Sequence, residues 1–328
     1  MNHTYKSFFL LIIFMLICFG IGYAGLARFQ PHKLPTMSDA ASYYKMTQFH
    51  YTEVPAPFRF RLLIPGLAGM INLILSKLFL GTWNSVCLSL LVVNSFFVSL
   101  TALVLIEISK ELHIEPKLTL LSAFIYMVSF PVLNGHLIGL VDAGEGFFIA
   151  VLILMVLRNH WFLVSIITMA SALVRETTPI FMGVYLISWW FLQRVLLKDQ
   201  NSKGIFYWLF AIVLGVMAIY LIKFIVGGDP YAGHEFSLEI LSQVPGRLID
   251  LVKSKTLIYT FSYLLPIGLL GIKQVPKALV VSSCCMGAAA ILLGAYGGIG
   301  SNISRPLFNT MGPMLIISST MFLGKWFR

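Results

Sequence analysis

The charged residues that interrupt apolar stretches are the side chains best suited to chemistry in this sequence. Asp39 follows a long apolar run, and it would act either as a helix N-cap or as a general base held over a membrane surface. Asp142 and Glu145 are three residues apart, which places both carboxylates on one face of a helix. This pair would contact a metal ion or a substrate, or else begin a solvated helix.

Two arginines lie in a proline-rich segment. Pro55 and Pro57 predict an extended chain, in which Arg59 and Arg61 would point to the same side. Two guanidinium groups in that arrangement bind a phosphate group well. The alternative is that both side chains extend toward the phosphates of the surrounding lipids.

The other candidates lie where apolar runs begin or end. Arg175 and Glu176 join runs 161–174 and 177–193, which are so short that the pair is predicted to lie below the membrane surface. Ionisable residues in that position form a structural ion pair or a functional site. Arg305 opens the last apolar run, where it would close over an anionic group or bind lipid headgroups.

The composition excludes a water-soluble globular protein. Of the 328 residues, 58% are hydrophobic and 11% are charged, whereas soluble domains carry roughly 25% charged residues. The apolar runs are continuous and do not alternate with a period of two, which excludes a β-barrel. The sequence therefore predicts an all-α polytopic membrane protein. Its net charge of +10 is scattered through short loops, which is typical of lipid contact and excludes a nucleic-acid partner.

About ten apolar runs approach the roughly 20 residues needed to cross a bilayer, and no internal repeat or linker divides the single domain, residues 1–328. The first run is too long for a signal peptide, so it is expected to be a retained span. The predicted spans are 7–27, 84–106, 118–134, 138–157, 160–175, 177–194, 205–226, 256–272, 278–296 and 307–324.

Segment 61–80 either crosses the membrane or lies in its interface. If it lies in the interface and the N-terminus is cytoplasmic, most basic loop residues fall on the cytoplasmic side, as the positive-inside rule requires; they are Lys110, Lys117, Arg158, Arg194, Lys198, Lys203, Lys273, Lys277, Lys325 and Arg328. We therefore predict an interfacial segment. The outer loop 28–83, with interfacial helices, and a second outer loop 227–255 are then on the outer face of the membrane. All the candidate residues are predicted to lie on that face.

This pattern resembles the GT-C superfamily of membrane glycosyltransferases, over roughly residues 7–255. The resemblance is carried by the early Ser38-Asp39-Ala40, by the run from Phe58 to Pro65 and by Arg175-Glu176-Thr177 after a span. It implies that a hexose or pentose passes from a polyprenyl-phosphate donor to an acceptor hydroxyl, with inversion at the sugar. It further implies that Asp39 is the base, and that Asp142, with Glu145, forms a second acidic site.

The resemblance also implies how the leaving lipid phosphate is stabilised, through Arg59, Arg61, Arg175 and Arg305. The first loop has no Asp-x-Asp or Glu-Asp doublet, so it is open whether Mg²⁺ or Mn²⁺ is needed; Asp39 and Asp142 are the carboxylates that would hold such an ion. No large soluble C-terminal domain is visible, which predicts a small or lipid-linked acceptor.

Three other functions compete with this interpretation. A transporter or flippase would place its polar groups near the midplane, often on repeated halves, whereas here they gather at the ends of apolar runs. A polysaccharide polymerase or ligase would also use outer arginines. The third competitor is a structural membrane subunit. The expected location is a bacterial cytoplasmic (inner) membrane, with the site facing the periplasm.

Overall fold

The regular structure is helical throughout the described part of the chain, as the sequence predicts. The computed structural model describes residues 3–29, 38–78, 84–196, 204–227, 238–297 and 303–326. The longer helices are α1 (His3–Phe29), α4 (Ser85–Glu111), α10 (Gly204–Val226), α14 (Lys277–Tyr296) and α15 (Ser304–Trp326). The shorter ones are α2 (Ser38–Thr47), α3 (Leu63–Leu78), α5 (Pro116–Met127), α6 (Phe130–Asn134), α7 (Asp142–Leu157), α8 (Trp161–Ser171), α9 (Thr178–Phe191), α11 (Leu238–Val252), α12 (Lys255–Phe261) and α13 (Leu264–Gly271).

Several of these helices are suited to cross a membrane. Five described helices are long and apolar enough to span a bilayer, namely α1, α4, α10, α14 and α15. Two bent pairs raise the number to seven if each pair forms one span: α5 with the segment Phe130–Ile138, bent by 40°, and α12 with Leu264–Gln274, bent by 47°. The chain therefore has the character of a helical integral membrane protein.

Three shorter apolar helices, α7, α8 and α9, fill the centre of the sequence. They have 16, 11 and 14 residues, fewer than the roughly 20 that a perpendicular span needs. Each corresponds to a predicted apolar run, and charged candidate residues lie at the start of α7 and between α8 and α9. The first turn of α7 holds Asp142 and Glu145, while Arg175 and Glu176 lie between α8 and α9.

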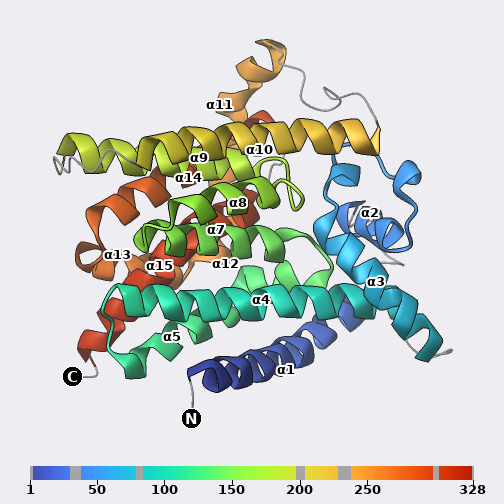
Figure 1. Ribbon diagram of the computed structural model, residues 1–328, viewed down its shortest axis with the longest axis horizontal. Helices are drawn as coiled ribbons and strands as arrows, with labels where there is room; N and C mark the ends of the chain where they lie inside the picture. Colours follow the sequence, from blue (N-terminus) through green and yellow to red (C-terminus); the bar gives the residue numbers. More distant parts are fainter. Residues whose placement is uncertain are drawn as a thin grey trace.

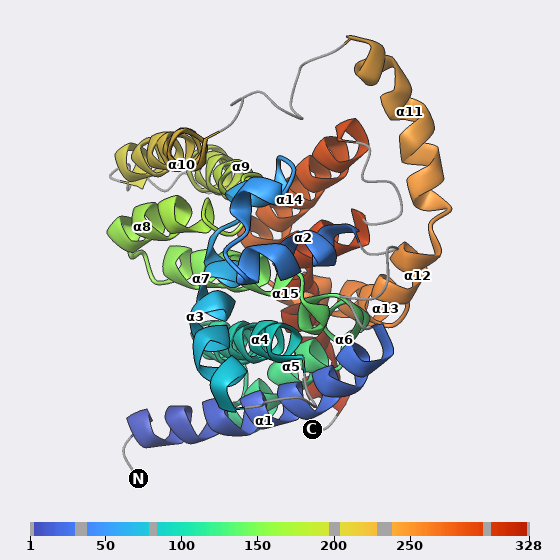
Figure 2. The same cartoon turned by 90° about the vertical axis from the view of Figure 1, so that its right-hand side faces the viewer.

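The helices form a bundle that is covered at one end. In Figure 1, α4, α7, α8, α9 and α10 run side by side, and in Figure 2 the short helices α2 and α3 lie across the ends of these helices. Segment 61–80 thus contains helix α3 at this end of the bundle, and its interfacial placement stays a prediction. In the second predicted outer loop, α11 follows residues 228–237, which lie outside the described residues, as do 30–37 and 79–83 of the first.

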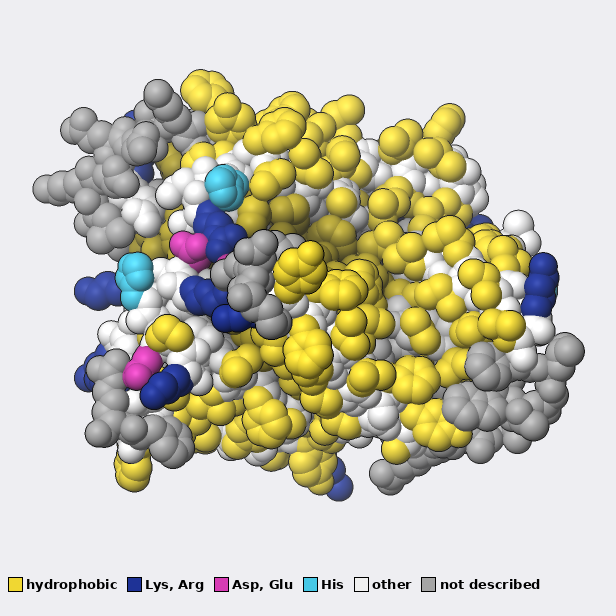
Figure 3. Space-filling view, turned by 60° about the horizontal axis from the view of Figure 1, so that its bottom comes forward, with side chains coloured by type: hydrophobic (Ala, Val, Ile, Leu, Met, Phe, Trp, Pro, Cys, Tyr) yellow, Lys and Arg dark blue, Asp and Glu magenta, His cyan; other side chains and the backbone are white. Residues whose placement is uncertain are grey.

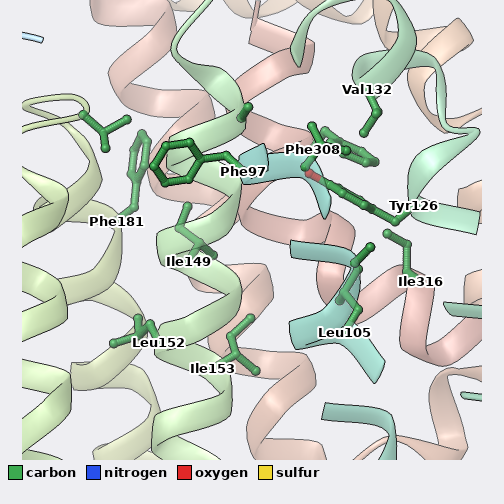
Figure 4. Close-up of a cluster of buried hydrophobic side chains, with 14 of the residues drawn as sticks. Phe97, Leu105, Tyr126, Val132, Ile149, Leu152, Ile153, Phe181, Phe308 and Ile316 are labelled. Carbon is green, nitrogen blue, oxygen red and sulfur yellow. The ribbon is translucent and has the colours of Figure 1, made fainter. Parts of the chain in front are cut away.

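Hydrophobic side chains fill the bundle and also cover its sides. Figure 4 shows Phe97 of α4, Ile149 of α7, Phe181 of α9 and Phe308 of α15 in the interior, where all four are at most 5% exposed. On the face drawn in Figure 3, hydrophobic side chains cover the middle, and charged side chains gather on the left of the view. A bundle that is apolar inside and outside is suited to a lipid environment.

A polar cap fixes the start of α4 at the covered end. The side chain of Asn84 accepts a hydrogen bond from the backbone N–H of Cys87 at 3.0 Å, which satisfies one of the free donors of the first helical turn. The same side chain donates to the Tyr44 hydroxyl at 2.9 Å. The cap of a spanning helix therefore also holds α2 in place.

Close packing of α13 on α15 requires a glycine at position 271. A Cβ atom there would overlap the backbone carbonyl of Ser318 on α15, and backbone cannot give way as a flexible side chain can. We expect Gly271→Val to lower the free energy of unfolding by about 2 kcal/mol or more. Thermal unfolding of the purified protein in detergent measures this loss.

The matched control for this prediction is Gly20→Ala in α1. Nothing lies within 4 Å of a Cβ atom at Gly20, and alanine favours a helix over glycine by roughly 1 kcal/mol. An unchanged or slightly raised melting temperature is expected for Gly20→Ala. If Gly271→Val behaved in the same way, the close approach of α13 and α15 would be refuted.

Candidate functional site

The ends of α7, α8, α9 and α15 and the two helices α2 and α3 bring the predicted residues together. The first turn of α7, the junction of α8 with α9 and the start of α15 all reach the end of the bundle where α2 and α3 lie (Figure 2). The acidic first turn of α7 suits the positive end of a helix dipole. Candidate residues of α2, of α7, of the junction between α8 and α9 and of α15 therefore lie together at this end of the bundle.

Arg305 joins the two predicted acidic sites. Its Nη1 donates to Oδ2 of Asp142 at 3.0 Å, and its Nη2 donates to Oδ2 of Asp39 at 3.4 Å. Arg305 lies in the first turn of α15, whereas Asp39 lies in the first turn of α2. One guanidinium group thus fixes the positions of two carboxylates that come from different parts of the chain.

Arg175 and Asn309 hold the second carboxylate of α7. Arg175 Nη1 donates to Glu145 Oε2 at 3.2 Å and to Asp142 Oδ1 at 3.5 Å. Asn309 Nδ2 donates to the same Oε2 of Glu145 at 2.9 Å, and Thr178 Oγ1 donates to its Oε1 at 3.4 Å. Asp142 and Glu145 therefore lie on one face of α7, as their spacing predicts. Both carboxylates contact a guanidinium group there.

Arg61 forms the most complete ion pair of the network. Its Nε and Nη2 donate to the two carboxylate oxygens of Glu176 at 3.2 and 2.9 Å, which is a bidentate arrangement. Its Nη1 donates to the Tyr43 hydroxyl at 2.7 Å. Tyr43 is buried one helical turn after Asp39, so the pair also fixes the helix that carries Asp39.

The prediction that Arg59 and Arg61 point to the same side is wrong. Residues Phe58–Phe60 form a 3-10 turn, with Pro57 in the helical region of φ and ψ, instead of the extended chain that the prolines suggested. In a 3-10 helix, residues two apart point in different directions because each residue turns the chain by a third of a circle. The Arg59 guanidinium accordingly lies over the Phe60 ring, 5.6 Å from its centroid.

The structure thus brings seven of the eight predicted site residues together and leaves Arg59 apart. Arg305 and Arg175 join Asp39, Asp142 and Glu145 in one hydrogen-bonded group. Arg61 and Glu176 form a second group, which interacts with the first electrostatically through Arg175, and the two groups together are the polar network.

The sequence analysis missed three members, Tyr43, Thr178 and Asn309. A helical spacing was the signal for two of them: Asn309 lies four residues after Arg305, and Tyr43 lies four residues after Asp39. Thr178 gave no such signal, since it reaches Glu145 only through the packing of α9 on α7.

Asp39 is the most accessible acid of this network. Its side chain is 30% exposed, whereas those of Asp142 and Glu176 are 3% and 7% exposed. The network contains four carboxylates, on Asp39, Asp142, Glu145 and Glu176, and three guanidinium groups, on Arg61, Arg175 and Arg305. Water or a substrate can therefore reach the Asp39 carboxylate more readily than the buried ones.

Glu176 makes the stability of this end depend on pH. Burial alone would raise its pKa, but the Arg61 guanidinium lowers the pKa from 4.5 to about 2. A lowered pKa contributes stability that is present above about pH 4.5 and is lost as the pH falls toward 2. We expect the melting temperature to fall over this window by more in the wild-type protein than in Glu176→Gln, which has no carboxyl group to titrate. Thermal unfolding between pH 6 and 3 measures the difference, and equal slopes would contradict it.

The prediction of a metal ion between Asp39 and Asp142 stays untested. Arg305 lies between these two carboxylates, and an ion at that position would have to displace its guanidinium group. Within the described ranges, no three His, Cys, Asp or Glu side chains are grouped closely enough to share an ion.

No protein-family profile matches the chain, and no curated protein has a significantly similar sequence.

Proposed function

We propose that this chain is a membrane glycosyltransferase of the GT-C kind, which moves a hexose or pentose from a polyprenyl-phosphate donor to an acceptor. The proposal includes about ten spans, with α7, α8 and α9 and the two bent pairs counted among them. It also places the protein in a bacterial inner membrane, with the network facing the periplasm. The acceptor is small or lipid-linked.

The observation that carries the proposal is the position of Asp39. The accessible Asp39 carboxylate accepts a hydrogen bond from Arg305, which also donates to Asp142. Both contacts lie at the end of the bundle where a lipid-linked substrate would present its headgroup. Asp39 then takes the proton of the acceptor hydroxyl while the hydroxyl oxygen forms a bond to the anomeric carbon. The bond from that carbon to the phosphate oxygen breaks, and its electron pair leaves with the lipid phosphate.

Preorganised cations favour this reaction because negative charge develops on the leaving phosphate. Arg305 is the best placed of the network arginines for this role, since its side chain is 19% exposed and those of Arg61 and Arg175 are 8% and 10% exposed. The buried pair of Arg61 with Glu176 and the contacts of Arg175 hold the site in shape. If Mg²⁺ or Mn²⁺ takes part, Asp39 and Asp142 are the residues that would bind it.

The test is sugar transfer by the purified protein from a panel of labelled polyprenyl-phosphate sugars. Transfer from one donor to an acceptor would identify the donor, and the configuration of the product would report inversion. The same assay with and without EDTA, followed by added Mg²⁺ or Mn²⁺, decides the metal requirement. Folded protein that transfers no sugar from any donor would refute the proposal.

The second candidate is a lipid transporter, which the two bent helix pairs favour. Broken helices are common at the substrate sites of transporters because they expose backbone groups inside the membrane. Movement of a fluorescent polyprenyl-phosphate lipid across liposomes, in the absence of sugar transfer, would support this candidate over the glycosyltransferase.

A further inference from the structure

His136 is a buried imidazole beside the polar network, and the proposed reaction does not use it. It opens the 3-10 turn His136–Ile138, between α6 and α7, and its side chain is fully buried. The Tyr126 hydroxyl lies 3.2 Å from its Nδ1. Both rings pack against Phe308, which is stacked on Tyr126 (Figure 4). The imidazole is therefore held in place by aromatic rings, and one of its nitrogens has a partner.

The other nitrogen of His136 lies near the side chain of Asn309. His136 Nε2 and Asn309 Oδ1 are both buried, and neither has a hydrogen-bond partner elsewhere in the described part of the chain. The two side chains interact with each other, although outside the strict distance and angle range of a hydrogen bond. A Cβ atom at Gly146 would lie 3.1 Å from Asn309 Oδ1 and 3.6 Å from His136 Cε1. The glycine therefore leaves room for the two side chains to meet.

The amide of Asn309 decides which of these two atoms donates. Its Nδ2 donates to Glu145 Oε2 at 2.9 Å and to the backbone carbonyl of Asp142 at 3.3 Å. A flipped amide would place its oxygen against the Glu145 carboxylate, which accepts hydrogen bonds but does not donate them. Oδ1 therefore remains for His136, and an amide oxygen can only accept. His136 meets it with a proton on Nε2, and Nδ1 then accepts from the Tyr126 hydroxyl.

We propose that His136 is a positioning residue of the candidate site, whose Nε2–H holds the Asn309 amide in the orientation that donates to the acidic first turn of α7. Each member of a series then donates to the next: Tyr126 to His136, His136 to Asn309, and Asn309 to Glu145. This series satisfies two buried polar atoms that have no other partner among the described residues. His136 acts through Asn309 and does not touch the substrate.

The effect of His136 on sugar transfer rests on the proposed function, whereas the order of the hydrogen bonds does not. Arg305 donates to Asp142 in the first turn of α7 and to Asp39, the proposed base. The position of that turn therefore influences where Arg305 holds Asp39. We expect a change at His136 to alter kcat more than the KM of the donor, because the proton acceptor is displaced while the groups that bind the donor stay in place.

The first test is nuclear magnetic resonance of the protein in detergent, with isotope-labelled histidine. The chain has seven histidines, and the signals that disappear in His136→Gln belong to His136. We expect a protonated Nε2 and an unprotonated Nδ1. Tyr126→Phe should shift the Nδ1 signal, and Asn309→Leu should shift the Nε2 signal. An unprotonated Nε2 would overturn the proposal, and this result does not depend on sugar transfer.

The second test is sugar transfer by variants of His136 and Asn309. His136→Leu should lower kcat by about tenfold or more, since small displacements of reacting groups are costly. His136→Gln should recover most of this loss, because the glutamine amide can place an N–H near the position of Nε2. The double variant His136→Leu/Asn309→Leu should be no slower than Asn309→Leu, because the two residues act in series. Losses that multiply, or a glutamine variant as slow as the leucine variant, would overturn the proposal.

The matched control is Phe97→Leu in α4. Phe97 is as buried as the residues of the series, but it packs on Phe147 and carries no hydrogen-bonding group. It should lower the melting temperature while kcat stays near the wild-type value. An equal loss of kcat in Phe97→Leu and His136→Leu would attribute both losses to stability and overturn the positioning role. Wild-type protein that transfers no sugar would refute the proposed function, and the resonance experiment would still decide the order of the hydrogen bonds.

Discussion

Asp39→Asn is expected to lower the rate of sugar transfer by a factor of about 10² to 10⁴, the range in which general bases contribute to catalysis. The amide keeps the size of the carboxylate and still offers an oxygen to Arg305, which contacts Asp39 at 3.4 Å in the wild-type protein. The fold should therefore be preserved while the proton acceptor is lost. Initial rates at saturating donor, together with the melting temperature, measure both effects.

Glu53→Gln is the matched control for this variant. Glu53 belongs to the same outer loop, and its side chain is 54% exposed and pairs with Lys45. Loss of its charge should leave transfer unchanged. Full transfer by Asp39→Asn would remove Asp39 from the role of base, and an equal loss in both variants would show that the loop tolerates no change of charge.

Breaking the buried pair of Arg61 with Glu176 is expected to cause the largest loss of stability. Arg61→Met or Glu176→Gln alone should each lower the free energy of unfolding by about 3–5 kcal/mol, since each leaves one buried charge without its partner. Both side chains are less than a tenth exposed, so water cannot compensate. Equilibrium unfolding in mixed micelles measures the loss.

The double variant Arg61→Met/Glu176→Leu tests the cause of that loss. It removes both charges and fills the space with apolar groups, which often costs little, so most of the stability should return. The control is Arg158→Met at the C-terminal end of α7, where the arginine pairs with Glu107 and Glu111 of α4 and all three side chains are about a third exposed. There we expect about 1 kcal/mol or less. A similar loss at both ends would contradict the prediction.

Hydropathy alone predicts the helical membrane character of the chain and the approximate place of its helices. Every predicted span from 84–106 to 177–194 contains a helix, because a long apolar stretch in lipid must satisfy its backbone hydrogen bonds within itself. The shared face of Asp142 and Glu145 also follows from local spacing, since both residues lie in the first turn of α7. These features depend only on neighbours in the sequence.

The partners of the charged residues were decided by the tertiary structure. Asp39 and Arg305 are 266 residues apart in the sequence, and Arg61 and Glu176 are 115 apart. No periodicity links such residues, because their contact depends on how α2, α8 and α15 pack. Packing also separated Arg59 from Arg61: a 3-10 turn directs one toward Phe60 and the other toward Glu176. Sequence identified the ionisable groups, and folding determined which carboxylate each arginine neutralises, because burial forces opposite charges to pair.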